Sequence, residues 1–339
     1  MKLRLTVLLS VGMMVSAGAA AQTQRYTITD LGIGMESGEN TSLAAALNNL
    51  GQAAVTFSST SNPYASMATF ISDETRVSLG TLGPLDSSTA EAINSSGEVA
   101  GYDYRSTRQA QSHAFVYSNG GMKDITSKAK FPFGTTATGI NDSGEVVGYG
   151  WPTGAVDHAF LYTGGEMRDL GTIGGQRSDT STALAINDAG QVVGNSTTQN
   201  GEQTNAFIYS NGVMTNIGPA GVDGSNAAAI NAVGQVVGIF FVGTATHAAL
   251  YSDGVWTDLG EGVSPTGINR SGEIVGTMGF LGGGAIYVNG KFVDLNSLIQ
   301  PDSDYSITGA FAINDAGQIL CNAEVRISGT THAVLLTPE

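Results

Sequence analysis

One ten-residue phrase recurs seven times along this chain and limits the fold more than any other feature. Its consensus is Ala-Ile-Asn-x-x-Gly-x-Val-Val-Gly, and the Gly three residues after the Asn is present in all seven copies. The Asn residues are Asn48, Asn94, Asn141, Asn187, Asn231, Asn269 and Asn314, with spacings of 46, 47, 46, 44, 38 and 45 residues. A repeat of this length is typical of solenoids and propellers, in which each unit buries its apolar face against its neighbours.

Each repeat has the pattern of four short strands. A small apolar strand, as at 182–187, ends in an Asn-x-x-Gly tight turn, where Asn or Asp bonds its own backbone and Gly takes a positive φ. A Val-Val-Gly strand, a longer variable loop and a third strand such as 158–162 follow. An Asn-Gly hairpin turn then leads to a fourth strand such as 167–170. Four strands repeated seven times predict an all-β, seven-bladed β-propeller.

The two ends of the chain predict how the ring closes. The fourth-strand phrase occurs in six repeats, and the last repeat ends after 332–336 without one. The missing strand is found at the N-terminal end, at 26–32. Pairing it with the last three strands completes the seventh blade and removes the exposed edges of an open array. We therefore expect one propeller domain over residues 22–339.

Charge and composition restrict the environment and the partners. Residues 1–21 have a basic start, an apolar stretch and a small-residue cleavage site before Gln22, which is typical of a secretory signal peptide. The net charge of −15 disfavours nucleic acid and anionic membrane surfaces. The single Cys excludes an intrachain disulfide and a Cys-based zinc cage, and Cys321 is expected to be a small buried strand residue. We expect a secreted or periplasmic monomer with no membrane span, cofactor or metal.

A second phrase carries a resemblance to a known family. His-Ala-Phe at 113–115 and 158–160, with Asp-Leu-Gly-Thr-Ile-Gly-Gly at 169–175, resembles the bacterial HAF-repeat extracellular proteins. The resemblance runs from about Tyr26 to the end of the chain, and the first and sixth repeats depart from it at 68–70 and 282–284. It implies an exported repeat protein, and it carries no assigned catalytic residue to this chain.

Propeller geometry predicts where a ligand is held. The short, uniform turns joining strands one–two and three–four share one face, and the variable loops share the other. Function tends to lie on variable loops held by a rigid scaffold, and aromatic planes beside polar groups suit sugars and peptides. The candidate ligand-binding residues are Tyr102, Tyr104, Arg105, Arg108, Tyr149, Trp151, Arg177 and Phe280. For Tyr102 and Tyr149 the alternative is that they finish the second strand and pack between blades.

The histidines and one set of aspartates recur at fixed repeat positions. His113, His158, His247 and His332 begin the third strand of blades spread around the ring, so they cannot meet at one metal ion. We expect each to form a hydrogen bond within its blade, with the Asp of the fourth strand. The recurring acids, which we expect to be structural, are Asp30, Asp124, Asp169, Asp258 and Asp294.

Two functions remain open at this point. The first is a secreted, non-catalytic binding module that holds a glycan or a surface protein on the variable face. The alternative is a polysaccharide-acting enzyme, a lyase or hydrolase, at the channel mouth. It would use Tyr104 as a base and the loop arginines Arg105, Arg108 and Arg177 to neutralise a uronate carboxylate. That alternative rests on analogy with other propellers.

Overall fold

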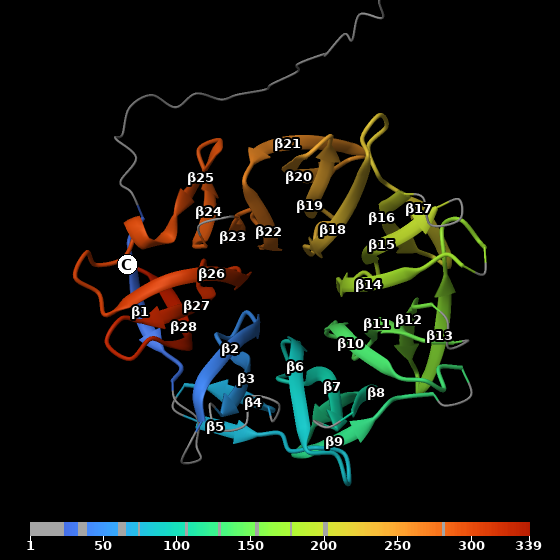
Figure 1. Ribbon diagram of the computed structural model, residues 1–339, viewed down its shortest axis with the longest axis horizontal. Coiled ribbons are helices and arrows are strands. Elements are labelled where there is room, and N and C mark those ends of the chain that lie inside the picture. The colour runs from blue at the N-terminus through green and yellow to red at the C-terminus, as the bar shows by residue number, and fades with distance from the viewer. Residues whose placement is uncertain are drawn as a thin grey trace, which may run out of the picture.

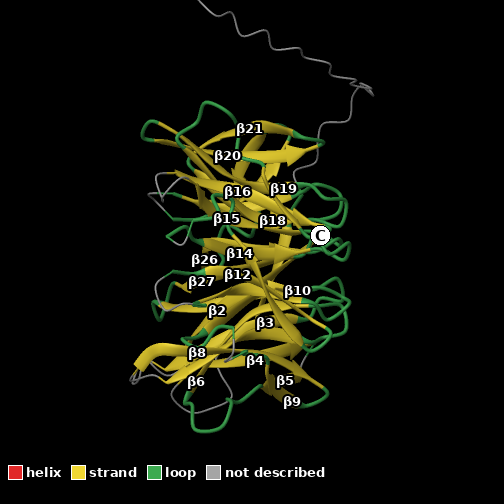
Figure 2. Ribbon diagram, turned by 90° about the vertical axis from the view of Figure 1, so that its right-hand side faces the viewer, coloured by secondary structure: helices red, strands yellow, loops and turns green. Residues whose placement is uncertain are grey.

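The structure is a ring of seven β-sheets around a central channel (Figure 1). It is a computed structural model and describes residues 24–32, 39–59, 66–73, 75–105, 108–127, 130–152, 156–176, 178–198, 203–279 and 282–339. The predicted signal peptide, Arg177 and Phe280 lie outside these residues. Every sheet in the described chain has four antiparallel strands, and the ribbon is a disc with loops on both sides of the strand layer (Figure 2). The predicted seven-bladed propeller is confirmed.

The strands follow one another from the channel outwards in blades 1 to 6. Blade 1 contains β2 (Glu39–Leu47), β3 (Ala53–Ser59), β4 (Ser66–Ser72) and β5 (Thr75–Ser78); blade 2 contains β6 (Ser87–Ile93), β7 (Val99–Arg105), β8 (Arg108–Ser118) and β9 (Gly121–Asp124). Blade 3 contains β10 (Thr135–Ile140), β11 (Val146–Gly150), β12 (His158–Thr163) and β13 (Glu166–Gly171); blade 4 contains β14 (Ser181–Ile186), β15 (Val192–Thr198), β16 (Gln203–Ser210) and β17 (Val213–Asn216). Blade 5 contains β18 (Gly224–Ile230), β19 (Val236–Val242), β20 (Ala245–Ser252) and β21 (Val255–Glu261); blade 6 contains β22 (Val263–Ile268), β23 (Ile274–Met278), β24 (Gly284–Val288) and β25 (Lys291–Asp294). A short 3-10 turn, η1 (Leu295–Ser297), leads to blade 7, which contains β26 (Tyr305–Ile313), β27 (Ile319–Val325) and β28 (Thr330–Pro338).

The N-terminal strand closes the ring, as the sequence predicts. β1 (Tyr26–Asp30) pairs antiparallel with β28 and gives blade 7 the order β1-β28-β27-β26. Figure 1 shows β1 and the C-terminus together in this blade. Tyr26 is buried beside Leu336 in the core of blades 6 and 7, so the first and last strands share one apolar cluster.

The two recurring phrases pack on each other inside blades 2 and 3. A Cβ on Gly148, the Gly of Val-Val-Gly, would lie 1.9 Å from the Thr136 carbonyl oxygen, and Phe160 of His-Ala-Phe covers the same spot. Phe160 is fully buried and packs against Ala92 and Ala100 of the preceding blade. Cys321 is likewise fully buried, as expected, and burial raises the pKa of its thiol.

The hairpin turns have the backbone that the Asn-Gly pairs predict. Asn119 and Gly120 have φ of 51° and 78°, and Asn211 and Gly212 have φ of 52° and 84°. Two positive values in a row define the mirror-image turn whose twist matches that of the flanking strands.

Each innermost strand carries a β-bulge, which the sequence pattern hides. The pairing register shifts by one residue near the end of all seven, and the extra residues are Ala45, Glu91, Thr138, Leu184, Ala228, Thr266 and Phe311. A bulge changes the direction of the side chain that it carries. In blades 3 and 6 the bulged threonine bonds the next blade: Thr138 Oγ1 donates to the Ala183 carbonyl at 2.9 Å, and Thr266 Oγ1 donates to the Ala310 carbonyl at 2.7 Å.

Candidate functional site

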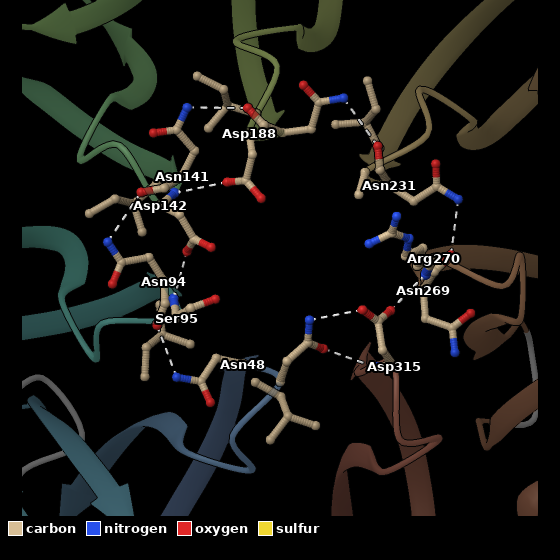
Figure 3. Close-up of a pocket in the computed structure, with 18 of the residues that line it drawn as sticks. Asn48, Asn94, Ser95, Asn141, Asp142, Asp188, Asn231, Asn269, Arg270 and Asp315 are labelled. Carbon is tan, nitrogen blue, oxygen red and sulfur yellow. Dashed lines mark hydrogen bonds between the residues drawn. The ribbon is translucent and has the colours of Figure 1, made fainter.

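The seven repeated Asn side chains form a closed ring of hydrogen bonds at one mouth of the channel (Figure 3). Each Nδ2 donates to the backbone carbonyl of the Asn in the next blade, and Asn314 closes the ring on Asn48 at 3.1 Å. In six of the seven, Oδ1 accepts two N–H groups of its own turn; for Asn187 these are Ala189 at 3.2 Å and Gln191 at 3.0 Å. Asn269 Oδ1 accepts the Glu273 N–H and the Ser271 hydroxyl instead. The bond to its own turn is predicted from the sequence, whereas the ring is not.

A cavity of about 210 Å³ lies inside this ring, on the face of the short turns. The residues after the Asn surround it, among them Asp142, Asp188, Arg270 and Asp315 (Figure 3). The three carboxylates are already used between blades: Asp188 accepts from the Asp142 N–H at 2.9 Å, and Asp315 accepts from the Arg270 N–H at 2.8 Å. Asp142 accepts from the Ser95 N–H in the same way. This mouth of the channel is therefore built to join the blades.

The other face brings two of the predicted tyrosines together. The rings of Tyr102 and Tyr104 stack with centroids 5.8 Å apart. Tyr104 and Arg105 lie in a strand rather than in a variable loop, because the β7–β8 hairpin runs on until Arg105 pairs with Arg108. Tyr104 Oη lies 3.0 Å from Ser66 Oγ of blade 1, so this tyrosine bridges two blades.

Blade 3 adds Tyr149 and Trp151 to the same face. Tyr149 lies in β11, and Trp151 follows directly in the loop with 38% of its surface exposed. Both line a small cavity together with Asp157. Burial raises the pKa of Asp157, although a hydrogen bond from the Trp151 side chain opposes that shift. One oxygen of Asp157, Oδ1, is buried and has no hydrogen-bond partner in the described chain.

Glu91 acts electrostatically on the tyrosines of both blades. It is the bulged residue of β6, the innermost strand of blade 2, and burial alone raises the pKa of its carboxyl to about 7. The phenol pKa values of Tyr102 and Tyr149 are raised too, mainly by burial and further by the charge of Glu91. We call Glu91, Tyr102, Tyr104, Tyr149, Trp151 and Asp157 the tyrosine–carboxylate cluster.

Tyr102 and Tyr149 lie in the second strand of their blades, as the packing alternative predicts. Both are half-buried strand residues, and each is paired across the sheet with a threonine of the innermost strand in its own blade, Thr89 for Tyr102 and Thr136 for Tyr149. They therefore form the floor of the cluster, while Trp151 forms its exposed edge.

The remaining predicted site residues are not gathered in the described chain. Arg105 is exposed at the end of β7, and Arg108 lies in β8 with its side chain outside the described residues. The convergence of these arginines and Arg177 with Tyr104, and a binding role for Phe280, stay predictions. Glu91 and Asp157 were missed. The signal for Glu91 was present, because aligned repeats show an acid at this position in blade 2 only.

The recurring histidines bond the fourth-strand aspartates, as predicted. The Nδ1 atoms lie 3.1 Å from Asp124 for His113, 3.0 Å from Asp169 for His158 and 3.0 Å from Asp258 for His247. His332 lies 2.8 Å from Asp30, across the β28–β1 closure. The hydrogen bond to Asp169 raises the pKa of His158; burial acts to raise the pKa of Asp169, but hydrogen bonds from His158 and the Gly171 N–H bring it below its usual value.

Within the described residues, no helix is long and apolar enough to cross a membrane. Among the same residues, no three His, Cys, Asp or Glu side chains are grouped so that they could hold a metal ion.

No family model and no curated protein matches the chain. Among solved structures, it is similar to YCF48 bound to a D1 peptide, with 12% identity, a TM-score of 0.53 and coverage of 95% of this chain and 98% of that one. It is also similar to a structure from a study of two prolyl endopeptidases (9% identity, TM-score 0.59, 88% and 50% covered). A third match is a puromycin-hydrolysing peptidase of Mycobacterium tuberculosis (10%, 0.53, 87% and 53%). The chain spans about half the length of each peptidase chain. At these identities the likeness shows the propeller fold alone.

Proposed function

We propose that the chain is an exported, non-catalytic binding module of the HAF-repeat type, and that it acts as a monomer. Its ligand, a glycan or a surface protein, is held on the variable face at the tyrosine–carboxylate cluster. The observation that carries this proposal is the cluster itself, in which the stacked pair Tyr102–Tyr104 lies beside Glu91, with Tyr149 and the exposed Trp151 in the next blade.

Comparison of equivalent positions supports a binding role for blades 2 and 3. One residue after the Gly of Val-Val-Gly, or after the residue in its place, Thr56, Asn195 and Asn322 each accept a hydrogen bond from the backbone of the next blade. Blades 2 and 3 carry Tyr102 and Tyr149 there instead. An aromatic ring gives up this inter-blade acceptor and offers a flat apolar surface that suits a sugar face or a peptide. The similar structure of YCF48 is a complex with a D1 peptide.

The test is a binding panel with matched variants. The mature chain from Gln22 is incubated with insoluble polysaccharides, including uronic-acid polymers, and with immobilised peptides. Trp151→Ala should abolish binding of any ligand held at the cluster, because exposed aromatic side chains dominate such contacts. Leu50→Ala, an exposed residue of the opposite face, is the control and should bind as the unmodified chain does. Equal binding by both variants would remove the cluster as the site.

One observation favours the enzyme as a second candidate. A carboxyl group with a pKa of about 7, as Glu91 has, is suited to general acid–base work, and two tyrosines lie beside it. The same panel decides this point when the supernatant is analysed for new oligosaccharides. Release that is lost in Glu91→Gln would make the protein a polysaccharide lyase or hydrolase; bound protein without release supports the binding module.

A further inference from the structure

We propose that the group held at the tyrosine–carboxylate cluster is a cation, the ammonium or guanidinium of a lysine- or arginine-containing segment of a partner protein. This inference rests on the proposed function and names the ligand chemistry of the same site. It selects a basic peptide over a neutral glycan.

The first ground is that, among the described residues, the two carboxylates of the cluster form no ion pair. Neither Glu91 nor Asp157 takes part in the ion pairs that described acids make with histidines. Asp157 Oδ1 is buried without a hydrogen bond. A buried carboxylate with no partner is costly, and an approaching cation removes that cost by pairing with it.

The second ground is the aromatic surface around these carboxylates. A cation over the face of a Trp or Tyr ring is attracted by the ring quadrupole, most strongly where water is excluded. Tyr102 and Tyr104 present two stacked rings, and Trp151 is exposed at the rim. Aromatic faces combined with unpaired acids are the arrangement that an ammonium or guanidinium group requires.

The third ground is a comparison of the bulge position in the seven blades. At the bulge position the other blades carry Ala45, Thr138, Leu184, Ala228, Thr266 and Phe311, none of which ionises. The two threonines use their hydroxyls to bond the next blade. The carboxylate of Glu91 does not take over that role, since it has no hydrogen bond within the described chain. An acid placed where the scaffold makes no use of it points to a ligand.

The groups around Glu91 set the expected pH dependence. Tyr102 and Tyr149 are neutral near pH 7, because burial raises their pKa values further above 10. Asp157 lies near His158, whose pKa is raised by the hydrogen bond to Asp169. As the pH rises from 6 to 8, the Glu91 carboxyl loses its proton and becomes charged. This change strengthens binding of a cation.

The experiment compares isosteric peptides by titration calorimetry at 0.15 M salt. The probes are hexa-arginine and hexa-lysine, with hexa-citrulline as the uncharged equivalent of arginine. The cationic peptides should bind at pH 8 at least tenfold more tightly than hexa-citrulline. Their affinity should fall about tenfold at pH 6, because a group with a pKa near 7 goes from about 90% to about 10% ionised over that range.

Matched variants separate the site from the general negative charge of the chain. Glu91→Gln should weaken hexa-arginine binding about tenfold at pH 8 and flatten its pH profile. Asp253→Asn removes the same charge from a turn on the opposite face, where the residue has a φ of 52° and equivalent turns carry Asn, so it should leave binding unchanged. The proposal is overturned if hexa-citrulline binds as tightly as hexa-arginine, or if Glu91→Gln weakens binding no more than Asp253→Asn.

The outcomes also keep this inference apart from the proposed function. A neutral glycan that is lost in Trp151→Ala, while cationic peptides show no preference for the cluster, leaves the binding module intact and refutes the cation. If no polysaccharide, peptide or cationic probe is sensitive to Trp151→Ala, both fail.

Discussion

The two mouths of the channel are built by the same seven repeats. The repeats carry the same residue at one mouth and different residues at the other. On the turn face every blade places an Asn at the same point, and the side chains join in one ring. On the variable face the blades differ, and ionisable and aromatic side chains collect in blades 2 and 3. A hydrogen-bond ring requires all its members, whereas a ligand site requires only some. Uniformity therefore marks the end that holds the disc together, and divergence marks the end that is free to bind.

The largest expected effect of a substitution is on the turn face. Asn187→Ala removes a donor to the Asn231 carbonyl and an acceptor for the N–H groups of Ala189 and Gln191. With several backbone groups left unpaired, we expect the free energy of unfolding to fall by about 3 kcal/mol. Urea denaturation measures this directly.

The control for the ring is another turn Asn of the same blade. Asn211 has a φ of 52° in a hairpin turn and is not in the ring, so Asn211→Gly should change the free energy of unfolding by less than about 0.5 kcal/mol. Equal effects of the two substitutions would show that the ring contributes no more than an ordinary turn.

The sequence predicts one mouth better than the other, for reasons of distance. The strand pattern, the closure by β1 and the His–Asp pairs each involve residues whose repeat positions are visible in the sequence. The Asn ring joins residues 38 to 47 positions apart in the chain, and 266 apart where it closes, and only the curvature of the closed disc places their turns side by side. Glu91 is hidden for another reason. A bulge shifts the side-chain alternation by one residue, so a strand read as regular assigns this acid to the wrong face.

The second prediction sharpens the comparison at the variable face. Glu91 has a pKa of about 7 in the folded chain against an ordinary value of 4.5, so the folded state binds more protons between these values and loses stability as the pH rises. The shift sets a ceiling of about 3 kcal/mol, which partial contact with water lowers to about 2 kcal/mol. Glu91→Gln should therefore stabilise the protein by about 2 kcal/mol at pH 8 and by little at pH 4.

Thermal unfolding at the two pH values checks this, with Asp253→Asn as the matched loss of one acid. A stabilising substitution that also weakens binding would show that Glu91 is kept for function at a cost in stability. A Glu91→Gln protein less stable than the unmodified chain at pH 8 would instead make Glu91 part of the scaffold, like the turn-face residues.

The third prediction concerns the His–Asp pairs, which lie in blades 2, 3, 5 and 7. The raised pKa of His158 means that its contribution is complete below about pH 6.5 and is lost as the pH rises through the folded-state value. The lowered pKa of Asp169 means that its contribution is present above about pH 3.8 and is lost at more acid pH. His158→Asn should therefore cost about 1 kcal/mol near pH 5.5 and less at pH 9.

Blade 4 provides the natural control for this pair. It carries Asn205 and Asn216 at the equivalent positions, so the double variant His158→Asn/Asp169→Asn copies a blade that already exists in the molecule. Its stability should follow pH without a contribution from this pair. A cost of His158→Asn that is the same at pH 5.5 and pH 9 would mean that the imidazole acts by packing alone.

The last prediction compares the two tryptophans, and the smallest expected effect on stability is that of Trp151→Ala. Trp256 is packed on Tyr251 with ring centroids 5.3 Å apart and donates its indole N–H to the Ile217 carbonyl. Trp151 is more than one-third exposed. Trp256→Ala should lower the free energy of unfolding by about 3 kcal/mol, and Trp151→Ala by less than about 0.5 kcal/mol, because only the first removes a packed side chain. Chemical denaturation of both variants gives the two values.

A loss of more than about 2 kcal/mol in Trp151→Ala would mean that this side chain is a structural member of blade 3. The binding surface would then have to be sought among the other residues of the variable face. Retained stability together with lost binding is the result that a ligand-holding tryptophan requires.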